Sequence, residues 1–207
     1  MKNIKLTTGR GILMFPYLFS PDTKFDSVGV YTVQLRLQGD PAAKLKEDLE
    51  SFLDSHLKEV KATTGKKPDK VLPIPMKNVT DDSGVSFIEF RFKMKPSFKS
   101  KTGEVVDQRP QVFDAKLQPL TEESCLGSGS EGKCSFEAVP YNTSFGCGIT
   151  LRLRAVQVLD LVQYNGGNSA SSGFEIEEGF VEDESKVAPA EATKQDTPTA
   201  EGNASDF

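Results

Sequence analysis

Residues 88–95 read Ile-Glu-Phe-Arg-Phe-Lys-Met-Lys, an unbroken alternation of apolar and charged side chains. Successive side chains of a β-strand point to opposite faces, so a period of two indicates a strand with one buried face. The four apolar residues are expected inside, and the opposite face presents Glu89, Arg91, Lys93 and Lys95. The stretch therefore predicts a sheet whose outer face is largely basic.

Two further runs repeat this pattern. In residues 31–37 the inward side chains are Tyr31, Val33, Leu35 and Leu37, and the outward ones are Thr32, Gln34 and Arg36. In residues 149–155 the inward side chains are Ile149, Leu151, Leu153 and Ala155, and the outward ones are Thr150, Arg152 and Arg154. The second run continues to residue 162 without strict alternation. A long strand whose phase slips is typical of a bulge or bend, as in a sheet that curls into a small barrel.

Only one stretch predicts a helix. Asp40 is a plausible N-cap, and Pro41 follows at the first helical position, where its missing N–H costs nothing. Apolar residues then recur at three- and four-residue spacing, and Gly65 lies beyond the end; the stripe is Leu45, Leu49, Phe52, Leu53, Leu57 and Val60. The only histidine, His56, lies beside this stripe and is expected at the helix surface or the edge of the core.

Composition divides the chain into three parts. Residues 1–165 carry the strand and helix patterns and are expected to form one domain, in which residues 66–75 and 126–132 are loops, the second a flexible one. Residues 166–173, rich in Gly and Ser, are expected to be a flexible linker. Residues 174–207 contain ten acidic residues and two lysines, a net charge of −8, with too few apolar residues to fold, so a disordered acidic tail is expected.

The two ends of this division carry net charges of opposite sign. The whole chain carries −5, so residues 1–173 carry +3. A mildly basic body joined to an acidic tail points to a polyanionic ligand.

Several classes of protein are disfavoured. No apolar run approaches the ~20 residues of a membrane helix, and we expect no secretion signal at the start. Three cysteines are too few for a disulfide framework, so a reducing cytoplasm is expected. No phosphate-binding loop, dinucleotide fingerprint or nucleophile elbow occurs. A Cys₃His zinc site would lack the short Cys-x2–4-Cys spacing, because Cys125, Cys134 and Cys147 are far apart in sequence. We predict that the chain is not an enzyme and needs no cofactor.

Binding of single-stranded nucleic acid needs cations along a groove and flat rings on which bases stack. Residues 91–101 supply Arg91, Lys93, Lys95, Lys99 and Lys101 with Phe98 among them, and Arg36, Arg152 and Arg154 would extend this track. Tyr17 and Tyr141, each preceded by proline, are candidate stacking residues. The alternative is that the lysines merely keep strand exteriors soluble and the aromatic residues pack in loops.

The acidic tail suggests a second interaction. It closes with Asp206-Phe207, and an exposed terminal ring among acidic residues has no rationale in solubility. An anchor for the pocket of a partner with a basic surface explains it.

Several motifs, taken in order, resemble the single-stranded DNA-binding proteins of T7-like bacteriophages. They are Phe15-Pro16-Tyr17 with Ser20-Pro21-Asp22, residues 29–35 followed by Asp40-Pro41, Phe90-Arg91-Phe92-Lys93 with Ser97-Phe98, Val139-Pro140-Tyr141-Asn142, and the terminal Phe207. The order and spacing of these motifs, which span most of the chain, carry the resemblance.

The resemblance implies an oligonucleotide-binding (OB) fold, a mainly β, five-stranded barrel with one amphipathic helix. It implies DNA contacts by Arg91, Lys93, Lys133 and Tyr141, with Lys2 or Lys5 contributing. It also implies annealing of complementary strands, work in the cytoplasm of the infected bacterial host, and a tail that binds the replicative DNA polymerase and helicase-primase and competes with DNA. Two positions depart from the family pattern: Thr143 replaces a tryptophan, and Val28 replaces an arginine.

The sequence thus predicts a protein that coats unpaired DNA during replication and recombination. The expected DNA-binding residues are Lys5, Arg36, Arg91, Lys93, Lys95, Phe98, Lys99, Lys133, Tyr141 and Arg152, and the expected partner-binding residues are Asp206 and Phe207. A homodimer is an open alternative to a monomer. Two rival functions are a phage structural or assembly protein with a β-barrel interaction domain and, with less support, a metal-dependent nuclease.

Overall fold

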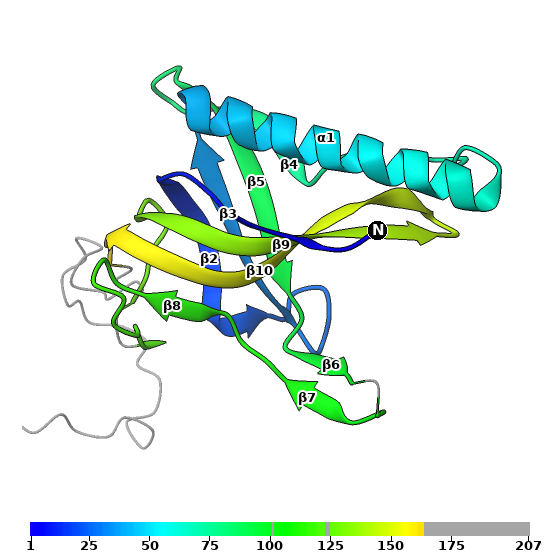
Figure 1. Ribbon diagram of the computed structural model, residues 1–207. Coiled ribbons are helices and arrows are strands. Elements are labelled where there is room, and N and C mark those ends of the chain that lie inside the picture. Colours follow the sequence, from blue (N-terminus) through cyan, green and yellow to red (C-terminus); the bar gives the residue numbers. More distant parts are fainter. Residues whose placement is uncertain (101, 123–124, 164–207) are drawn as a thin grey trace, which may run out of the picture. The chain divides into compact units, whose positions relative to one another are not determined.

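The computed structural model describes residues 1–100, 102–122 and 125–163, which form ten β-strands and one helix (Figure 1). In chain order they are β1 (Ile4–Thr7), β2 (Gly11–Asp22), β3 (Val30–Leu37), α1 (Gly39–Thr64), β4 (Met76–Thr80), β5 (Ser86–Met94), β6 (Ser97–Lys99), β7 (Val105–Asp107), β8 (Gln111–Phe113), β9 (Glu131–Thr143) and β10 (Gly146–Asp160). The expected linker and acidic tail, including Asp206 and Phe207, lie outside the described residues. The expectation of a mainly β protein with a single helix is confirmed for the described part.

Eight of the described strands form one sheet, and five of these pair in a closed circuit. The circuit runs β9–β2–β3–β5–β10 and returns to β9, because β9 pairs with both β2 and β10. Strands β1, β4 and β8 extend the sheet at its margins. The β5–β10 junction is parallel and rests on a single pair, Arg152 with Lys93, which brings the two basic runs of the sequence together.

Glycine allows the junction of β2 with β9. Gly11 and Gly132 face each other there. A Cβ on Gly11 would lie 2.4 Å from the Arg36 carbonyl oxygen, and one on Gly132 would lie 2.4 Å from the Gln157 carbonyl oxygen. Backbones that approach this closely exclude any side chain, so the two glycines let the circuit close.

The alternating runs bury their apolar sides in a common core, as predicted. Phe90, Phe92, Val33, Leu35 and Leu151 are fully buried, with several others of the same runs. The phase slip of β10 is a bulge, since its register to β9 shifts between Leu153 and Ala155. The prediction that Ala155 lies inside is wrong, because the bulge turns Arg154 and Ala155 outward together and returns Val156 to the core.

Helix α1 covers the β9–β10 hairpin (Figure 1). Its buried side consists of Ala42, Leu45, Leu49, Phe52, His56 and Val60, and it ends at Gly65 with a φ of 71°, as predicted. Its predicted start at Asp40 is wrong: the N-cap is Gln38 and the helix begins at Gly39, whose φ of 64° turns the chain sharply out of β3. None of the helices in the described part combines the length and apolarity of a membrane span.

Residues 126–130 form a turn in the expected loop at residues 126–132, but this loop ends before Glu131 and is held by hydrogen bonds. Leu126 and Ser130 are buried, and Glu131 and Gly132 already belong to β9. The Ser130 hydroxyl donates to the Gly127 carbonyl oxygen at 2.8 Å and accepts from the Val162 backbone N–H at 3.0 Å. Glycine and serine here build a tight hydrogen-bonded turn, which composition alone does not distinguish from a flexible loop.

Candidate nucleic-acid interface

The outward faces of β5 and β10 bring together cations that are about 60 positions apart in sequence. Lys93 of β5 lies beside Arg152 of β10 in register, Arg91 lies on the same side of β5, and the exposed Lys95 comes directly after the strand. Arg154 lies on the outward side of β10 with Arg152, as alternation predicts. Two adjoining hollows open on this surface.

The first hollow, here called the Tyr141 hollow, has a volume of about 500 Å³. Arg91, Lys93 and Tyr141 line it together with residues 73–77, Gln34, Glu89, Ile149 and Thr150. Two predicted cations and the predicted stacking ring therefore share one cavity. Its apolar lining from Pro73, Ile74 and Ile149 is the kind of surface on which a base packs.

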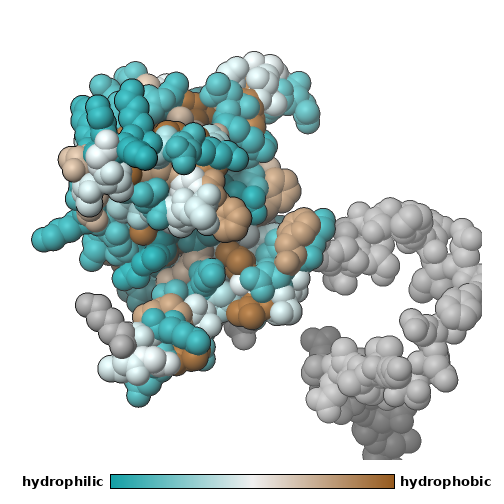
Figure 2. All heavy atoms as spheres, turned by 90° about the vertical axis from the view of Figure 1, so that its right-hand side faces the viewer, coloured by the Kyte–Doolittle hydropathy of each residue, from teal (hydrophilic) through white to brown (hydrophobic). Residues whose placement is uncertain are grey.

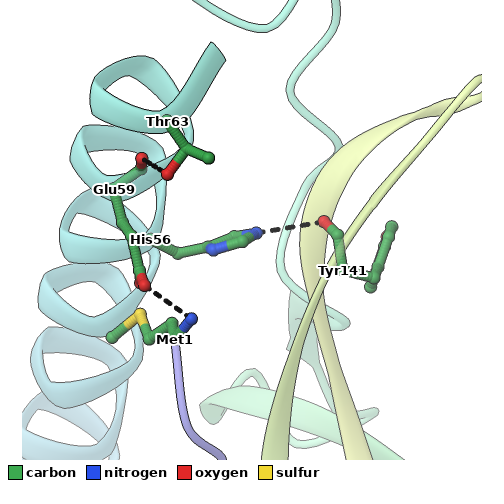
Figure 3. A network of polar contacts seen from close by, with 5 residues as sticks. All are labelled: Met1, His56, Glu59, Thr63 and Tyr141. Carbon is green, nitrogen blue, oxygen red and sulfur yellow. Dashed lines mark hydrogen bonds and ion pairs between the residues drawn. The ribbon is translucent and has the colours of Figure 1, made fainter.

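The Tyr141 ring is placed by its neighbours on two elements. Gly148 lies opposite Tyr141 on β10, and a Cβ there would lie 2.7 Å from the Tyr141 hydroxyl, so any larger residue would displace the ring. On the other side, His56 Nε2 lies 3.1 Å from the Tyr141 carbonyl oxygen (Figure 3). Because a carbonyl only accepts, Nε2 carries the proton and donates. His56 is thus a buried helix residue that attaches α1 to β9, which agrees with the core-edge position and not with the surface position among the two expected.

A second contact attaches the start of the chain to the same helix. The Met1 amino group lies 2.7 Å from Glu59 Oε1, one turn beyond His56 (Figure 3). Glu59 is about half exposed, so this ion pair stabilises little. Of these two contacts to α1, the buried hydrogen bond of His56 is therefore the stronger, and it is the one that holds Tyr141.

The second hollow, here called the Phe98 hollow, has a volume of about 620 Å³. It is lined by Val30, Lys93, Met94, Lys95, Ser97, Phe98, Lys99, Gln108, Thr150, Arg152 and Arg154. Phe98 belongs to the β6–β7 hairpin, which pairs only with itself and is fixed at its base by a hydrogen bond from Gln108 Nε2 to the Lys95 carbonyl oxygen, 3.0 Å long. The hairpin places a half-exposed aromatic ring beside five predicted or candidate cations.

The two hollows share Lys93 and Thr150, and we call them together the basic groove. Its lining has one acidic side chain, Glu89, against seven basic ones: Lys77, Arg91, Lys93, Lys95, Lys99, Arg152 and Arg154. Figure 2 views the side toward which the β9–β10 hairpin extends in Figure 1, and it is mostly hydrophilic with apolar side chains between. A cationic surface interrupted by rings can hold a flexible polyanion that carries stackable groups.

Three predicted DNA-binding residues line neither hollow. Arg36 lies outward on β3, but its Nε donates to Glu89 Oε2 at 2.9 Å. Lys5 lies on β1 opposite Glu137, one strand away from Arg152. Lys133 lies on β9 opposite Gln157, eight residues before Tyr141. The candidate stacking residue Tyr17 is about half exposed on β2, opposite Thr32 of β3, which itself lies opposite Lys93.

Sequence reasoning missed two features of the groove. Residues 73–77 form a wall of the Tyr141 hollow, although the prolines there indicated only a loop. Glu89 was grouped with the exposed face of β5, yet it is buried. The signal for Glu89 was available in the register of the strands, because Lys77 of β4 and Arg36 of β3 lie opposite it.

Glu89 forms a saturated ion pair at the margin of the groove. Arg36 Nε and Lys77 Nζ each lie 2.9 Å from one of its carboxylate oxygens. Burial by itself raises the pKa of Glu89, but the hydrogen bonds and charges of Arg36 and Lys77 outweigh it, so the pKa is lowered below 4.5. The carboxylate therefore stays ionised and fixes Arg36.

This lowered pKa predicts acid-sensitive stability. A carboxyl whose pKa is lower in the folded state stabilises the fold above its unfolded pKa, and this contribution is lost as the pH falls through the folded value. Glu89→Gln should therefore lower the free energy of unfolding at pH 7 by about 2 kcal/mol. The difference from the wild type should shrink as the pH drops below 4.5. Urea unfolding at a series of pH values measures it; a difference that stays constant down to pH 3 would contradict the assignment.

Of the three cysteines in the described residues only Cys125 is exposed. Nowhere in residues 1–100, 102–122 and 125–163 do three or more His, Cys, Asp or Glu side chains gather as a metal site. Cys134 and Cys147 are fully buried, and burial raises the pKa of both thiols. Such thiols are poor nucleophiles and poor ligands.

Comparison with known proteins identifies the family. The profile of the family described as single-stranded DNA-binding protein, bacteriophage T7, matches residues 14–161, well over half of the chain. This protein belongs to that family. The T7-type chain is 30% identical to the single-stranded DNA-binding protein of enterobacteria phage T3 over 165 residues, which covers 73% of the chain and 70% of the relative. It is 32% identical to that of Escherichia phage T7 over 120 residues, covering 56% and 51%.

Solved structures share the fold of this T7-type protein. The crystal structure of the single-stranded DNA-binding protein encoded by bacteriophage T7 matches with a TM-score of 0.61 at 22% identity, over 88% of the chain and all of that structure. The single-stranded DNA-binding protein from bacteriophage Enc34 in complex with single-stranded DNA matches with a TM-score of 0.54 at 16% identity, over 79% and 89%. The predicted family is confirmed, and the relatives are named for binding single-stranded DNA, in agreement with the prediction of a non-enzymatic protein.

Proposed function

We propose that this protein binds single-stranded DNA in the basic groove and thereby coats and protects unpaired DNA during phage replication and recombination. One observation carries the proposal: Lys93 and Tyr141, chosen from the sequence as a phosphate contact and a stacking ring, line the same hollow. Family membership supports it, since the relatives are named as single-stranded DNA-binding proteins.

The mechanism follows from the two kinds of group in the groove. Lysine and arginine neutralise phosphates and release condensed counterions, which gives binding without sequence preference. Tyr141 and Phe98 offer rings on which bases stack, each contributing about 1–3 kcal/mol. Paired bases in a duplex hide their faces from such rings, so the groove favours unpaired strands.

We further propose that the closed circuit of β2, β3, β5, β9 and β10 is an OB-fold barrel. Five strands, one parallel junction and a long curled pair closing the circuit fit that architecture. The binding face of OB folds lies on the middle strands and the loops beside them. The proposal assigns this face to β5 and the β9–β10 hairpin.

Titration with oligo-dT tests the proposal. The chain has four tyrosines and no tryptophan, so its intrinsic fluorescence reports on tyrosine alone. We expect oligo-dT to quench it, with an affinity that falls steeply with salt, by a log–log slope of about −3.5 to −5 for five to seven phosphate contacts. A structural or assembly protein with merely solvating lysines would show neither quenching nor salt-sensitive binding. Incubation of labelled DNA with Mg²⁺ tests the nuclease alternative.

The acidic residues 174–207 are proposed to compete with DNA for the basic groove and to bind the replicative DNA polymerase and helicase-primase, with Asp206 and Phe207 at the contact. The support is electrostatic: a segment of net charge −8 belongs to the same chain as a groove with seven cations. We also propose that the protein acts in the cytoplasm of the infected host. The proposal is compatible with either a monomer or a homodimer.

Deleting residues 174–207 should tighten oligo-dT binding. A tethered anion occupies the groove at a high effective concentration, so its removal should raise the affinity by about tenfold at low salt and less at high salt. Fluorescence titrations of the full chain and of the deletion variant at matched salt measure this. Equal or weaker binding by the folded deletion variant would refute competition by the tail.

A further inference from the structure

Glu137 occupies an unusual place for an acid, at the centre of the cations beside the basic groove. It points outward from β9, with Lys5 of β1 on one side and Arg152 of β10 on the other. It is only 8% exposed. Its Oε2 lies 3.8 Å from Arg152 Nη1, and its Oε1 lies 3.7 Å from Arg154 Nε. Asn3 Nδ2 is a further donor at 3.5 Å.

These contacts differ in kind from those of Glu89. Both oxygens of Glu89 accept short hydrogen bonds of 2.9 Å, one from Arg36 and one from Lys77, so both oxygens are occupied. The Glu137 distances exceed hydrogen-bonding range for both arginines, whose side chains stay 45% and 46% exposed. Arg152 and Arg154 are thus partly neutralised by Glu137, yet their guanidinium groups have donors free to bind a phosphate in the Phe98 hollow that they line.

We propose that Glu137 is a built-in counterion of the DNA-binding surface, which lowers the affinity for single-stranded DNA and makes binding less sensitive to salt. The proposal rests on the function proposed above. It assigns Glu137 the role of an affinity-limiting residue that acts through Arg152 and Arg154, without a contact to DNA of its own.

The salt effect follows from the number of net positive charges that the protein brings to the DNA. Each net positive charge that a protein brings to DNA releases counterions to the solution, and this release makes binding weaken as salt rises. A carboxylate fixed beside two arginines cancels one of their charges permanently and is not released. It also repels an arriving phosphate, with little screening because Glu137 is buried.

Glu137→Gln tests the proposal, with Glu131→Gln as the matched control. Both variants remove one negative charge from β9, but Glu131 pairs with Arg10 and lines no part of the basic groove. We expect Glu137→Gln to tighten oligo-dT binding about fivefold at low salt and to steepen the log–log salt slope by about 0.7, the increment for one added charge on a single strand. Glu131→Gln should stay within twofold of the wild type with an unchanged slope.

A thermodynamic cycle separates this role from a merely structural one. In a background with Arg152→Gln and Arg154→Gln, the change Glu137→Gln should no longer improve binding, because the charges that Glu137 cancels are gone. If Glu137→Gln unfolds, Glu137→Met fills a similar volume without charge and takes its place in both comparisons.

The outcomes are distinguishable. A folded Glu137→Gln variant that binds as the wild type does, or more weakly, overturns the role of Glu137 while the proposed function stands. Equal tightening by Glu131→Gln also overturns it, since net charge alone would then explain the effect. A wild-type protein that does not bind oligo-dT at all refutes the proposed function itself.

Discussion

Lys93→Glu is expected to weaken oligo-dT binding by about thirtyfold to hundredfold at low salt, the largest effect of any single change in the basic groove. Lys93 lines both hollows and is exposed, and it forms no ion pair within the described residues. The change removes one phosphate contact and places a carboxylate where the strand passes between the hollows. Loss of a charge-assisted contact plus the new repulsion amounts to roughly 2–3 kcal/mol.

Lys116→Glu is the matched control for this prediction. Lys116 is also exposed, in the turn after β8, and lines neither hollow. The two variants carry the same net charge, so fluorescence titrations at several salt concentrations compare position alone. The loss for Lys93→Glu should shrink as salt rises, because the contact is electrostatic. A similar loss for both variants would show that binding depends on net charge and not on the groove.

The pattern of side chains in the sequence predicts the strands of the circuit well, because the core enforces it. Residues 31–37 and 88–95 bury their apolar sides as expected, and the slip in the β10 pattern marks a real bulge. Boundaries were less predictable. The helix begins at Gly39 because a left-handed glycine redirects the chain, a choice that the capping residues Asp40 and Pro41 did not reveal.

The candidate site shows a similar limit. Alternation identifies Arg91, Lys93 and Lys95 as outward residues, but it says nothing about which strand lies beside β5. Only the parallel pairing with β10 adds Arg152 and Arg154 to the same surface. Non-local pairing also decides which cations are available, since register places Arg36 beside Glu89 and leaves Lys93 beside Thr32.

Buried acids explain why counting cations in the sequence overstates the binding charge. Glu89 and Glu137 stand at outward positions of β5 and β9, and each offsets basic residues from neighbouring strands. A strand face that is basic in the sequence is partly neutralised by acidic side chains of the neighbouring strand. For Lys5 and Lys133 the sequence resemblance is still the main argument.

Phe136→Ala is expected to destabilise the domain by about 3–5 kcal/mol, the largest effect on folding among the changes considered. Phe136 of β9 is fully buried, and its ring packs against that of Phe92 of β5 with centroids 4.9 Å apart. The pair joins two strands of the closed circuit that are not neighbours in the sheet. Truncation would leave a cavity between them, and the midpoint of thermal unfolding should fall by roughly 10 °C.

Phe145→Ala is the control, because it makes the same chemical change at a ring that is 83% exposed in the turn between β9 and β10. It should leave the free energy of unfolding within about 0.5 kcal/mol of the wild type. Calorimetry or urea unfolding of both variants measures the difference. Because Phe136 holds β9 and Phe92 holds β5, the strands that bear Tyr141 and Lys93, the folded Phe136→Ala protein should also bind oligo-dT more weakly. Equal stability of the two variants would mean that the contact between Phe92 and Phe136 does not join the two sides of the groove.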